Sequence, residues 1–276
     1  MTSQSEQQPS AAVPDTARNY VGGWIDANGD THDIINPATG EAFADITYST
    51  EVDVDEAVDV AHDAFQEWRE TPPVERSQYL FDLKAELDDR QEDIAQALSR
   101  EHGNTLNEAR GEIRRGIENV EVAAGTPNML REGSGTVEDV APGMDESAVR
   151  QPLGVFTAIT PFNFPAMIPL WFLPYAVATG NTFILKPSEK VPLSSKIIFE
   201  AIDAVDFPDG VVNLVNGGAD TVNALLEHDD IEGVSFVGST PIAQYIYETA
   251  AEHGKRVQAQ GGAKNYAVVT DSAELD

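Results

Sequence analysis

The sequence predicts an α/β fold in which a doubly wound parallel sheet carries helices on both faces. Three observations predict it. From Gly154 onwards, short apolar segments alternate with segments of helical character, and this alternation is typical of parallel strands joined by helices. The apolar segments are nearly continuous, as expected of strands that are covered on both faces. Long amphipathic segments precede them and favour N-terminal helices packed on the sheet. The combination is Rossmann-like.

The first part of the chain predicts short strands followed by long helices. Residues 1–16 are polar and lack an apolar h-region, so we expect a disordered lead-in and no signal peptide. Residues 20–46 contain turn signals such as "NPATGE", which favour short strands. Apolar residues at helical spacing, prolines at a helix start and a stop at Gly103 favour three helices. These predicted helices span residues 53–70, 72–103 and 105–125.

A Gly-rich, acidic segment at residues 131–150 separates these helices from the alternating part. We expect it to form an extended oligomerisation arm or hairpin, with strands near residues 135–140 and 146–151, and not part of the core. In the alternating part, the predicted strands span residues 155–160, 182–186, 211–215, 233–237 and 256–260. The predicted helices between and after them span residues 166–179, 193–205, 221–227 and 241–252.

Composition excludes several classes of function. The 276 residues include 47 acidic and 17 basic side chains, a formal charge of −30, which repels nucleic acid and anionic membranes. The charges are dispersed along the chain, and we interpret this as adaptation to high salt. The apolar segment 152–185 contains four prolines and Asn163, so it favours a buried strand and helix over a membrane span. A cytoplasmic location is the default expectation. Without cysteine, and with histidines at no metal-ligand spacing, the chain predicts no disulfide and no metal site.

Polar turns follow the predicted strands: "TPFN", "KPSE", "NGGAD", "GSTP" and "GGAK". Ligands bind at the carboxyl ends of the strands in such sheets. Asn163 is bracketed by prolines and aromatic residues, so it is either an amide on a rigid loop or an ordinary helix cap. Lys186 and Glu189 are either a grip for ribose hydroxyls or a solvated surface pair. Ser239 precedes a helix and either faces an anion or caps that helix.

The strand ends, in this order, resemble the aldehyde dehydrogenase superfamily. The motifs that carry the resemblance are "ITPFNFP", "GNTFILKPSEKVP", "VSFVGST" and "GGAKN", and before them "INPATGE", "AFQEWRETPPVERSQYLF" and "LSREHGNTLNEARGEIRRG". The likeness runs from about Tyr20 to the last residue. It is strongest to the methylmalonate-semialdehyde dehydrogenase branch, whose members transfer the acyl group to coenzyme A.

The resemblance implies a nucleotide-binding domain made of residues 17–130 and 151–262. In it, the amide of Asn163 would donate a hydrogen bond to the aldehyde oxygen as that oxygen becomes an oxyanion. Thr160 and Phe162 would line the nucleotide site.

Further cofactor-binding positions follow from the same resemblance. Lys186 and Glu189 would hold the adenosine ribose, and the Glu189 carboxylate would favour NAD over NADP by repelling a 2′-phosphate. Lys190, where relatives often carry arginine, is expected to weaken that preference slightly. Ser239 would bind the pyrophosphate, and Gly261 is counted with the cofactor-binding positions.

The resemblance also implies a substrate and a nucleophile. Arg115, more than Arg114, would pair with the carboxylate of a semialdehyde; the alternative is a solvated helix face. Hydrolytic members carry a glutamate where this chain has Ala259, which favours attack by coenzyme A over attack by water. The family's catalytic cysteine is absent, and residues 263–276 resemble only the start of the catalytic domain.

We therefore expect NAD-dependent oxidation of a carboxylated semialdehyde to an acyl-coenzyme A, with this chain supplying the NAD site and Asn163. The parent enzyme is expected to be a homotetramer or homodimer. Two alternatives remain open. The chain is an inactive, truncated nucleotide-binding fragment, or its parent is a hydrolytic enzyme that releases a free acid.

Overall fold

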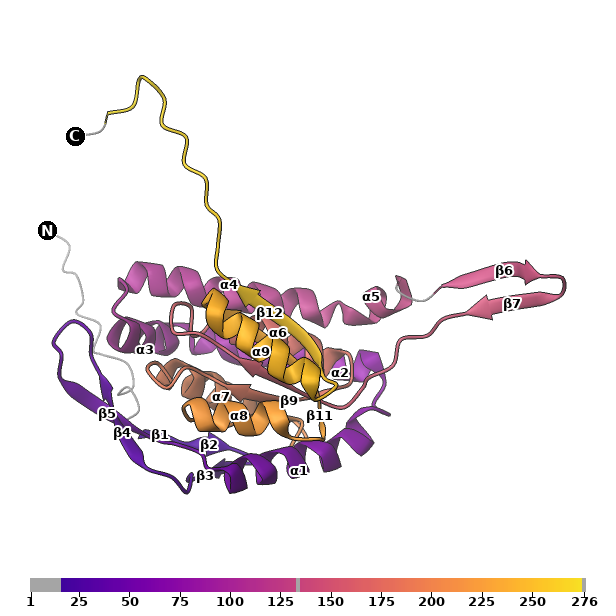
Figure 1. Ribbon diagram of the computed structural model, residues 1–276, viewed down its shortest axis with the longest axis horizontal. Helices are drawn as coiled ribbons and strands as arrows, with labels where there is room; N and C mark the ends of the chain where they lie inside the picture. The colour runs from indigo at the N-terminus through magenta and orange to yellow at the C-terminus, as the bar shows by residue number, and fades with distance from the viewer. Residues whose placement is uncertain (1–15, 133–134, 275–276) are drawn as a thin grey trace, which may run out of the picture.

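The computed structural model of the protein describes residues 16–132 and 135–274. A seven-stranded sheet lies at its centre, in the order β12-β11-β8-β9-β10-β2-β3 (Figure 1). Five of its strands are parallel: β8 (Val155–Ile159), β9 (Thr182–Lys186), β10 (Val212–Leu214), β11 (Ile231–Gly238) and β12 (Arg256–Gly261). The predicted parallel sheet is confirmed. Two short N-terminal strands, β2 (Asn19–Tyr20) and β3 (Trp24–Ile25), extend it in antiparallel orientation.

The order of the parallel strands makes the sheet doubly wound. The chain enters through β8 at the centre, continues to β9 and β10 on one side, and then crosses to β11 and β12 on the other. The switch therefore lies between β8 and β11, where Ile159 pairs with Phe236. In sheets of this kind the crevice at the switch point receives ligands.

Side chains that alternate along the strands pack into two separate hydrophobic cores, one on each face of the sheet. In β9, Phe183 and Leu185 belong to one core, and Ile184 between them belongs to the other. The larger core contains α2 (Pro73–Asp89), α3 (Gln91–His102), α4 (Leu106–Ala124), α6 (Pro169–Ala178) and α7 (Leu193–Val205). The other core contains α1 (Glu51–Trp68), α8 (Ala219–Glu227) and α9 (Thr240–Glu252). Helices thus cover both faces, as predicted (Figure 1).

The prediction of one helix over residues 72–103 is wrong, because the helix breaks at Arg90. This residue leaves the helical conformation (φ −96°, ψ 6°) and joins α2 to α3. Its backbone N–H still donates to the Glu86 carbonyl, and its own carbonyl accepts from Ile94. Neither proline nor glycine marks the position, so the break has no sequence signal. It lets α2 and α3 pack separately on α4 and α7.

The segment after α4 forms a helix and a hairpin. Helix α5 (Thr126–Glu132), which the sequence did not predict, reaches into the proposed arm, 131–150. The hairpin of β6 (Thr136–Ala141) and β7 (Met144–Ser147) then projects away from the body of the molecule (Figure 1). Valine and methionine side chains are exposed along it. Its role in oligomerisation stays a prediction.

The remaining N-terminal strands form a small separate sheet in the order β1-β5-β4, made of β1 (Thr16–Ala17), β4 (Thr31–Ile35) and β5 (Ala42–Thr47). The proposed lead-in lies outside the described residues except for Thr16, which begins β1. The apolar segment 152–185 forms β8, α6 and β9, a strand–helix–strand unit as expected. Among the described helices, none has the length and apolar character that a membrane crossing requires.

Candidate functional site

Four of the predicted cofactor-binding residues lie at the same edge of the sheet. Thr160 follows β8, Lys186 ends β9, Ser239 follows β11 and Gly261 ends β12. The parallel register brings these ends together, since Ile159 pairs with Lys186 and Gly238 pairs with Gly261. The structure therefore places them around the switch point of the sheet.

The loop after β8 presents Asn163 without using its side chain. Thr160 is held by a 3.1 Å hydrogen bond from its backbone N–H to the Lys186 carbonyl, and Phe162, Asn163 and Phe164 are exposed. Helix α6 begins only at Pro169, with Ile168 at the N-cap, so the alternative that Asn163 caps a helix is wrong. Within the described residues, no hydrogen bond engages the Asn163 amide. A donor on this loop is free to meet a ligand.

Two cavities meet at this loop. The larger, about 570 Å³, is lined by Phe162, Glu189 and Lys190 together with residues of β4 and the end of α3. The smaller, about 360 Å³, is lined by Asn163, Phe164, Arg115 and acidic side chains of α4. His102 lines both. The predicted oxyanion donor and the predicted substrate guanidinium thus share one cavity, and three predicted cofactor residues share the other.

Lys186 is not part of a solvated surface pair, which was the alternative for it and Glu189. Its ammonium lies 3.6 Å from the Glu189 carboxylate, and the Lys186 side chain is only 4% exposed. Burial lowers the pKa of Lys186, and the Glu189 charge opposes that shift. Nearby, the Lys190 ammonium lies 5.4 Å from the centre of the Phe162 ring. The pair offers a fixed cation and a partly exposed acceptor.

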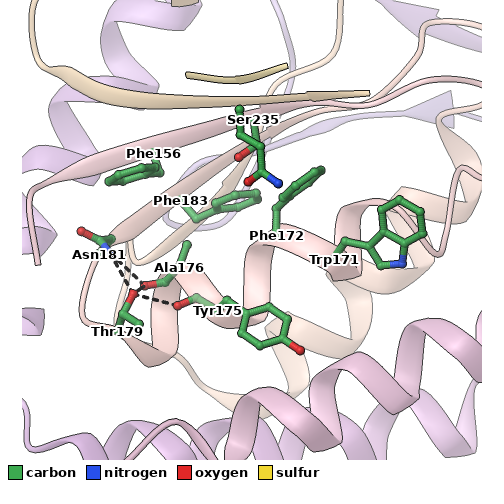
Figure 2. A pocket seen from close by; sticks show the side chains of 10 residues that line it. Phe156, Trp171, Phe172, Tyr175, Ala176, Thr179, Asn181, Phe183 and Ser235 are labelled. Carbon is green, nitrogen blue, oxygen red and sulfur yellow. Dashed lines mark hydrogen bonds between the residues drawn. The ribbon is translucent and has the colours of Figure 1, made fainter. Parts of the chain in front are cut away.

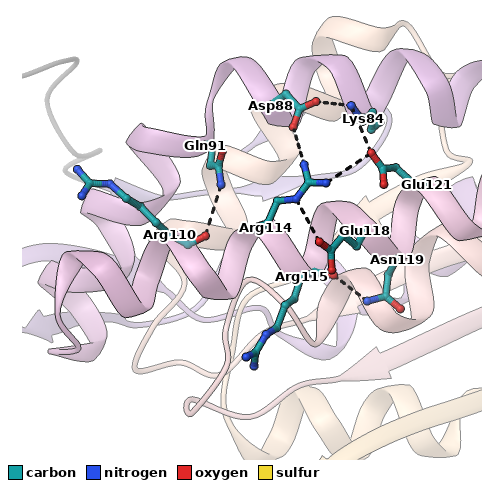
Figure 3. A network of polar contacts seen from close by, with 9 residues as sticks. All are labelled: Lys84, Asp88, Gln91, Arg110, Arg114, Arg115, Glu118, Asn119 and Glu121. Atoms are coloured by element: carbon teal, nitrogen blue, oxygen red, sulfur yellow. Dashed lines mark hydrogen bonds and ion pairs between the residues drawn. The ribbon is translucent and has the colours of Figure 1, made fainter.

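Arg114 and Arg115 have different surroundings (Figure 3). The Arg114 guanidinium lies within ion-pair distance of Asp88, Glu118 and Glu121, and Lys84 joins the same network. The Arg115 guanidinium points away from that network, and across the described part of the chain no acidic side chain pairs with it. Its position in the smaller cavity makes Arg115 the better candidate for binding an anion.

Ser239 occupies the N-cap position of α9 but does not cap it. Its φ and ψ are extended, and its side chain makes no capping hydrogen bond, so the hydroxyl stays available at a helix N-terminus. Gly261 has a packing reason to be glycine. A Cβ there would lie 2.6 Å from the Ala243 Cβ and 3.0 Å from the Thr240 Cα. The end of β12 is thereby held against the start of α9.

The sequence did not single out Glu112, the most buried carboxylate of the smaller cavity. Its spacing was a usable signal, since Glu112 falls on the buried face of α4 between Ala109 and Gly116. A charged residue on an apolar stripe needs partners, and these partners come from the loop after Asn163. No group of three or more histidine or acidic residues that suits a metal ion occurs among the described residues.

A third cavity, about 400 Å³, is lined by residues near the starts of β8 and β9 and not by their carboxyl ends (Figure 2). Phe156 and Phe183 from the sheet face aromatic side chains of α6 across it, and Asn181 bonds to Thr179 at its rim. Ser235 and Gln258 from neighbouring strands add polar groups. The sequence did not predict this cavity, and none of the predicted site residues lines it.

Residues 24–276 match the aldehyde dehydrogenase family. Malonate-semialdehyde dehydrogenase 2 of Shouchella clausii is 49% identical over 263 residues, which are 95% of this chain and 54% of that protein. The crystal structure of methylmalonate-semialdehyde dehydrogenase from Oceanimonas doudoroffii is 44% identical, with a TM-score of 0.88 over 91% of this chain and 51% of its own.

A structure from Sinorhizobium meliloti, provisionally assigned as a methylmalonate-semialdehyde dehydrogenase, is complexed with NAD. It is 42% identical, with a TM-score of 0.87, and the match covers 91% of this chain and 51% of that one. The chain thus spans about half the length of the relatives that it matches.

Proposed function

The chain belongs to the aldehyde dehydrogenase family, and on that premise we propose that it supplies the NAD site and the oxyanion donor of an enzyme that oxidises a carboxylated semialdehyde. One observation carries the proposal. The Asn163 amide and the Arg115 guanidinium line the same cavity, and neither has a side-chain partner in the part of the chain that the structure describes. One ligand can therefore present an aldehyde oxygen to the first and a carboxylate to the second. The names of the similar malonate- and methylmalonate-semialdehyde dehydrogenases support this class of substrate.

The strand ends fit a nicotinamide dinucleotide. Lys186 and Glu189 offer a cation and an acceptor for ribose hydroxyls, and the Ser239 hydroxyl lies at a helix N-terminus suited to the pyrophosphate. The Thr160 hydroxyl is buried and has no partner among the described residues, as expected of a group that awaits a ligand. When bound, NAD accepts the hydride that leaves the substrate carbon. A carboxylate at Glu189 disfavours the 2′-phosphate of NADP.

Asn163 acts on the oxygen of the aldehyde. A thiolate would attack the aldehyde carbon, a carbon–sulfur bond would form, and the carbonyl electron pair would move to the oxygen. The amide N–H of Asn163 donates a hydrogen bond to the negative charge that develops there, an interaction whose removal costs roughly 3–4 kcal/mol in known enzymes. The thiolate must come from outside this chain, since its sequence contains no cysteine.

Coenzyme A is the proposed acyl acceptor. Ala259 lies in β12 opposite Phe236 and cannot take a proton from water. A thiol ionises more easily than water near neutral pH. It can therefore attack a thioester without the glutamate that hydrolytic members carry at this position. Release of a free acid is the competing outcome.

The lack of a cysteine favours a second candidate, a module that binds the nucleotide without turnover of its own. Assembly through the β6–β7 hairpin as a homodimer or homotetramer belongs to the same proposal.

Two measurements test the proposal. Calorimetric titration of this chain with NAD should show binding heat. If no binding heat is measured, the chain does not supply an NAD site. In the complete enzyme, meaning a protein that contains this chain and the cysteine, NADH formation from malonate semialdehyde should accelerate when coenzyme A is added. A rate that is indifferent to coenzyme A would reject the interpretation of Ala259 and favour hydrolysis.

A further inference from the structure

The carboxylate of Glu112 binds the backbone of the loop that presents Asn163. Its Oε1 atom accepts hydrogen bonds from the backbone N–H groups of Ala166, at 2.9 Å, and of Met167, at 3.2 Å. The residue is 4% exposed, and within the described residues no basic side chain pairs with it. Hydrogen bonds to a charged acceptor are roughly twice as strong as neutral ones. These two bonds therefore fix the loop firmly.

The loop is held at both ends by hydrogen bonds to its backbone, and between them the Phe164 carbonyl accepts from the Ile168 N–H and the Lys190 ammonium lies over the Phe162 ring. At its start, the Thr160 N–H donates to the Lys186 carbonyl. At its end, Glu112 holds Ala166 and Met167. Between these anchors, no backbone N–H of residues 162–164 makes a hydrogen bond within the described structure. The two anchors therefore contribute to the position of Asn163, and Glu112 is one of them.

Helix α4 touches this region again one turn after Glu112. A Cβ at Gly116 would lie 2.7 Å from the Leu170 Cδ1 atom and 3.5 Å from the Met167 Cα atom. The helix also carries Arg115 into the same cavity. A single rigid helix therefore determines where the guanidinium lies and where the loop with the amide is docked.

We propose that Glu112 is a positioning residue for Asn163: its buried carboxylate fixes the loop backbone and so aims the amide into the cavity that Arg115 lines. The inference rests on the proposed function, because it takes Asn163 as the oxyanion donor. A donor contributes fully only when it is already oriented at the moment of reaction. The charged groups around the Glu112 carboxylate are Glu108 and Arg115 on its own helix, and Glu101 and His102 at the end of α3.

The chain offers a matched control for Glu112. Glu108 lies on the same helix and lines the same cavity, but its carboxylate accepts from the N–H and hydroxyl of Thr105 in a capping box. Removing Glu108 loosens the start of α4 and leaves the loop anchor intact. Glu112→Gln keeps the size of the side chain and one acceptor, so it should rescue part of the effect of Glu112→Ala.

The test is nuclear magnetic resonance of the full chain, with the Asn163 side-chain amide assigned from an Asn163→Ala spectrum. In Glu112→Ala we expect those signals to shift or broaden, and amide exchange at Ala166 and Met167 to rise at least tenfold. Glu112→Gln should give smaller changes of the same kind, and Glu108→Ala should give none. Exchange is compared with that of core amides in the same spectra, so a rise confined to Ala166 and Met167 cannot come from lower global stability.

Unchanged Asn163 signals in a folded Glu112→Ala protein would overturn the proposal and leave Glu112 a structural anchor of α6. If Glu112→Ala does not fold, Glu112→Gln decides, because exchange at Ala166 equal to that of the unmodified chain would overturn it as well. NAD titration of the same samples separates the two hypotheses. Failure to bind NAD refutes the proposed function, whereas the response of Asn163 tests Glu112 alone.

Discussion

Arg114 and Arg115 are neighbours in α4, yet Arg114 forms ion pairs with three carboxylates, whereas Arg115 lines a cavity and pairs with no acidic side chain among the described residues. The chain has 47 acidic and 17 basic residues, and among those that the structure describes none of the acidic side chains pairs with Arg115. The Arg114 ion pairs are exposed, and such pairs contribute little to stability. The Arg115 guanidinium, by contrast, is available to pair with an anionic ligand.

Replacing Arg115 should impair recognition of the substrate carboxylate. In the complete enzyme, Arg115→Ala should lower kcat/KM for malonate semialdehyde by roughly a hundredfold, which is about 2.7 kcal/mol. An aldehyde of similar size without a carboxylate should be almost unaffected. Arg114→Ala is the matched control and should change kcat/KM by less than about twofold. Equal losses for both aldehydes would show that Arg115 only supports the fold.

Glu189 should set the choice of dinucleotide. In Glu189→Gln, calorimetry should show the affinity for NADP rising relative to the affinity for NAD by roughly tenfold, which is about 1.4 kcal/mol. The reason is that the carboxylate that repels a 2′-phosphate is gone. Lys190→Ala should move the preference the other way, since its ammonium lies near the same cavity. If the ratio of the NAD and NADP affinities is unaltered in Glu189→Gln, the adenosine ribose does not bind at Glu189.

Glu101 should make stability depend on pH. This buried carboxylate accepts from the backbone N–H groups of Leu193 and Ser194 at the start of α7. Burial raises the pKa of Glu101 to about 7. Between its ordinary value of 4.5 and that value, the folded protein holds a proton that the unfolded chain has released. The free energy of unfolding should therefore fall as pH rises across this window, by up to about 3 kcal/mol, and level off above it.

The measurement for Glu101 is urea unfolding at about pH 5 and pH 7.5 at constant salt. Glu101→Gln cannot ionise, so its loss of stability between the two pH values should be smaller than that of the unmodified chain. Comparing the two proteins cancels the contribution of the other carboxylates. The same pH dependence in both would contradict the assignment.

Salt should stabilise the fold. With a formal charge of −30, repulsion between acidic side chains opposes the compact state, and added salt screens it. We expect the melting temperature to rise by several degrees between about 0.1 M and 2 M potassium chloride. A melting temperature that is indifferent to salt would refute the interpretation of the acidic composition as adaptation to high salt.

The sequence predicted the elements whose signals are local. Segments such as residues 182–186 and 193–205 coincide with β9 and α7, because continuous apolar runs and helical stripes are legible without tertiary context. The break at Arg90 was not predictable in this way, since ordinary helix-forming residues surround it. Strands β2 and β3 contain only two residues each, which is too short for any periodicity. They belong to the main sheet only because β2 pairs with β10 and β3 pairs with β2.

In the candidate site, too, the sequence predicted what local signals indicate and missed what depends on tertiary packing. The sequence indicated which residues end the strands, and the parallel register brings them together at one edge. Glu112 was missed because its partners lie 54 and 55 residues away. The spacing of Glu112 on α4 indicates that it is buried, but which distant backbone it bonds depends on packing that no local pattern contains. The cavities depend on packing for the same reason.

The loop after β8 gives Phe162 to the larger cavity and Asn163 to the smaller one. A ligand in either cavity therefore acts on the same few residues of backbone. If a ligand in the first cavity changes affinity in the second by some factor, thermodynamic linkage requires the reverse effect to be equal. Any coupling through this short segment therefore has a single free energy, whichever ligand arrives first.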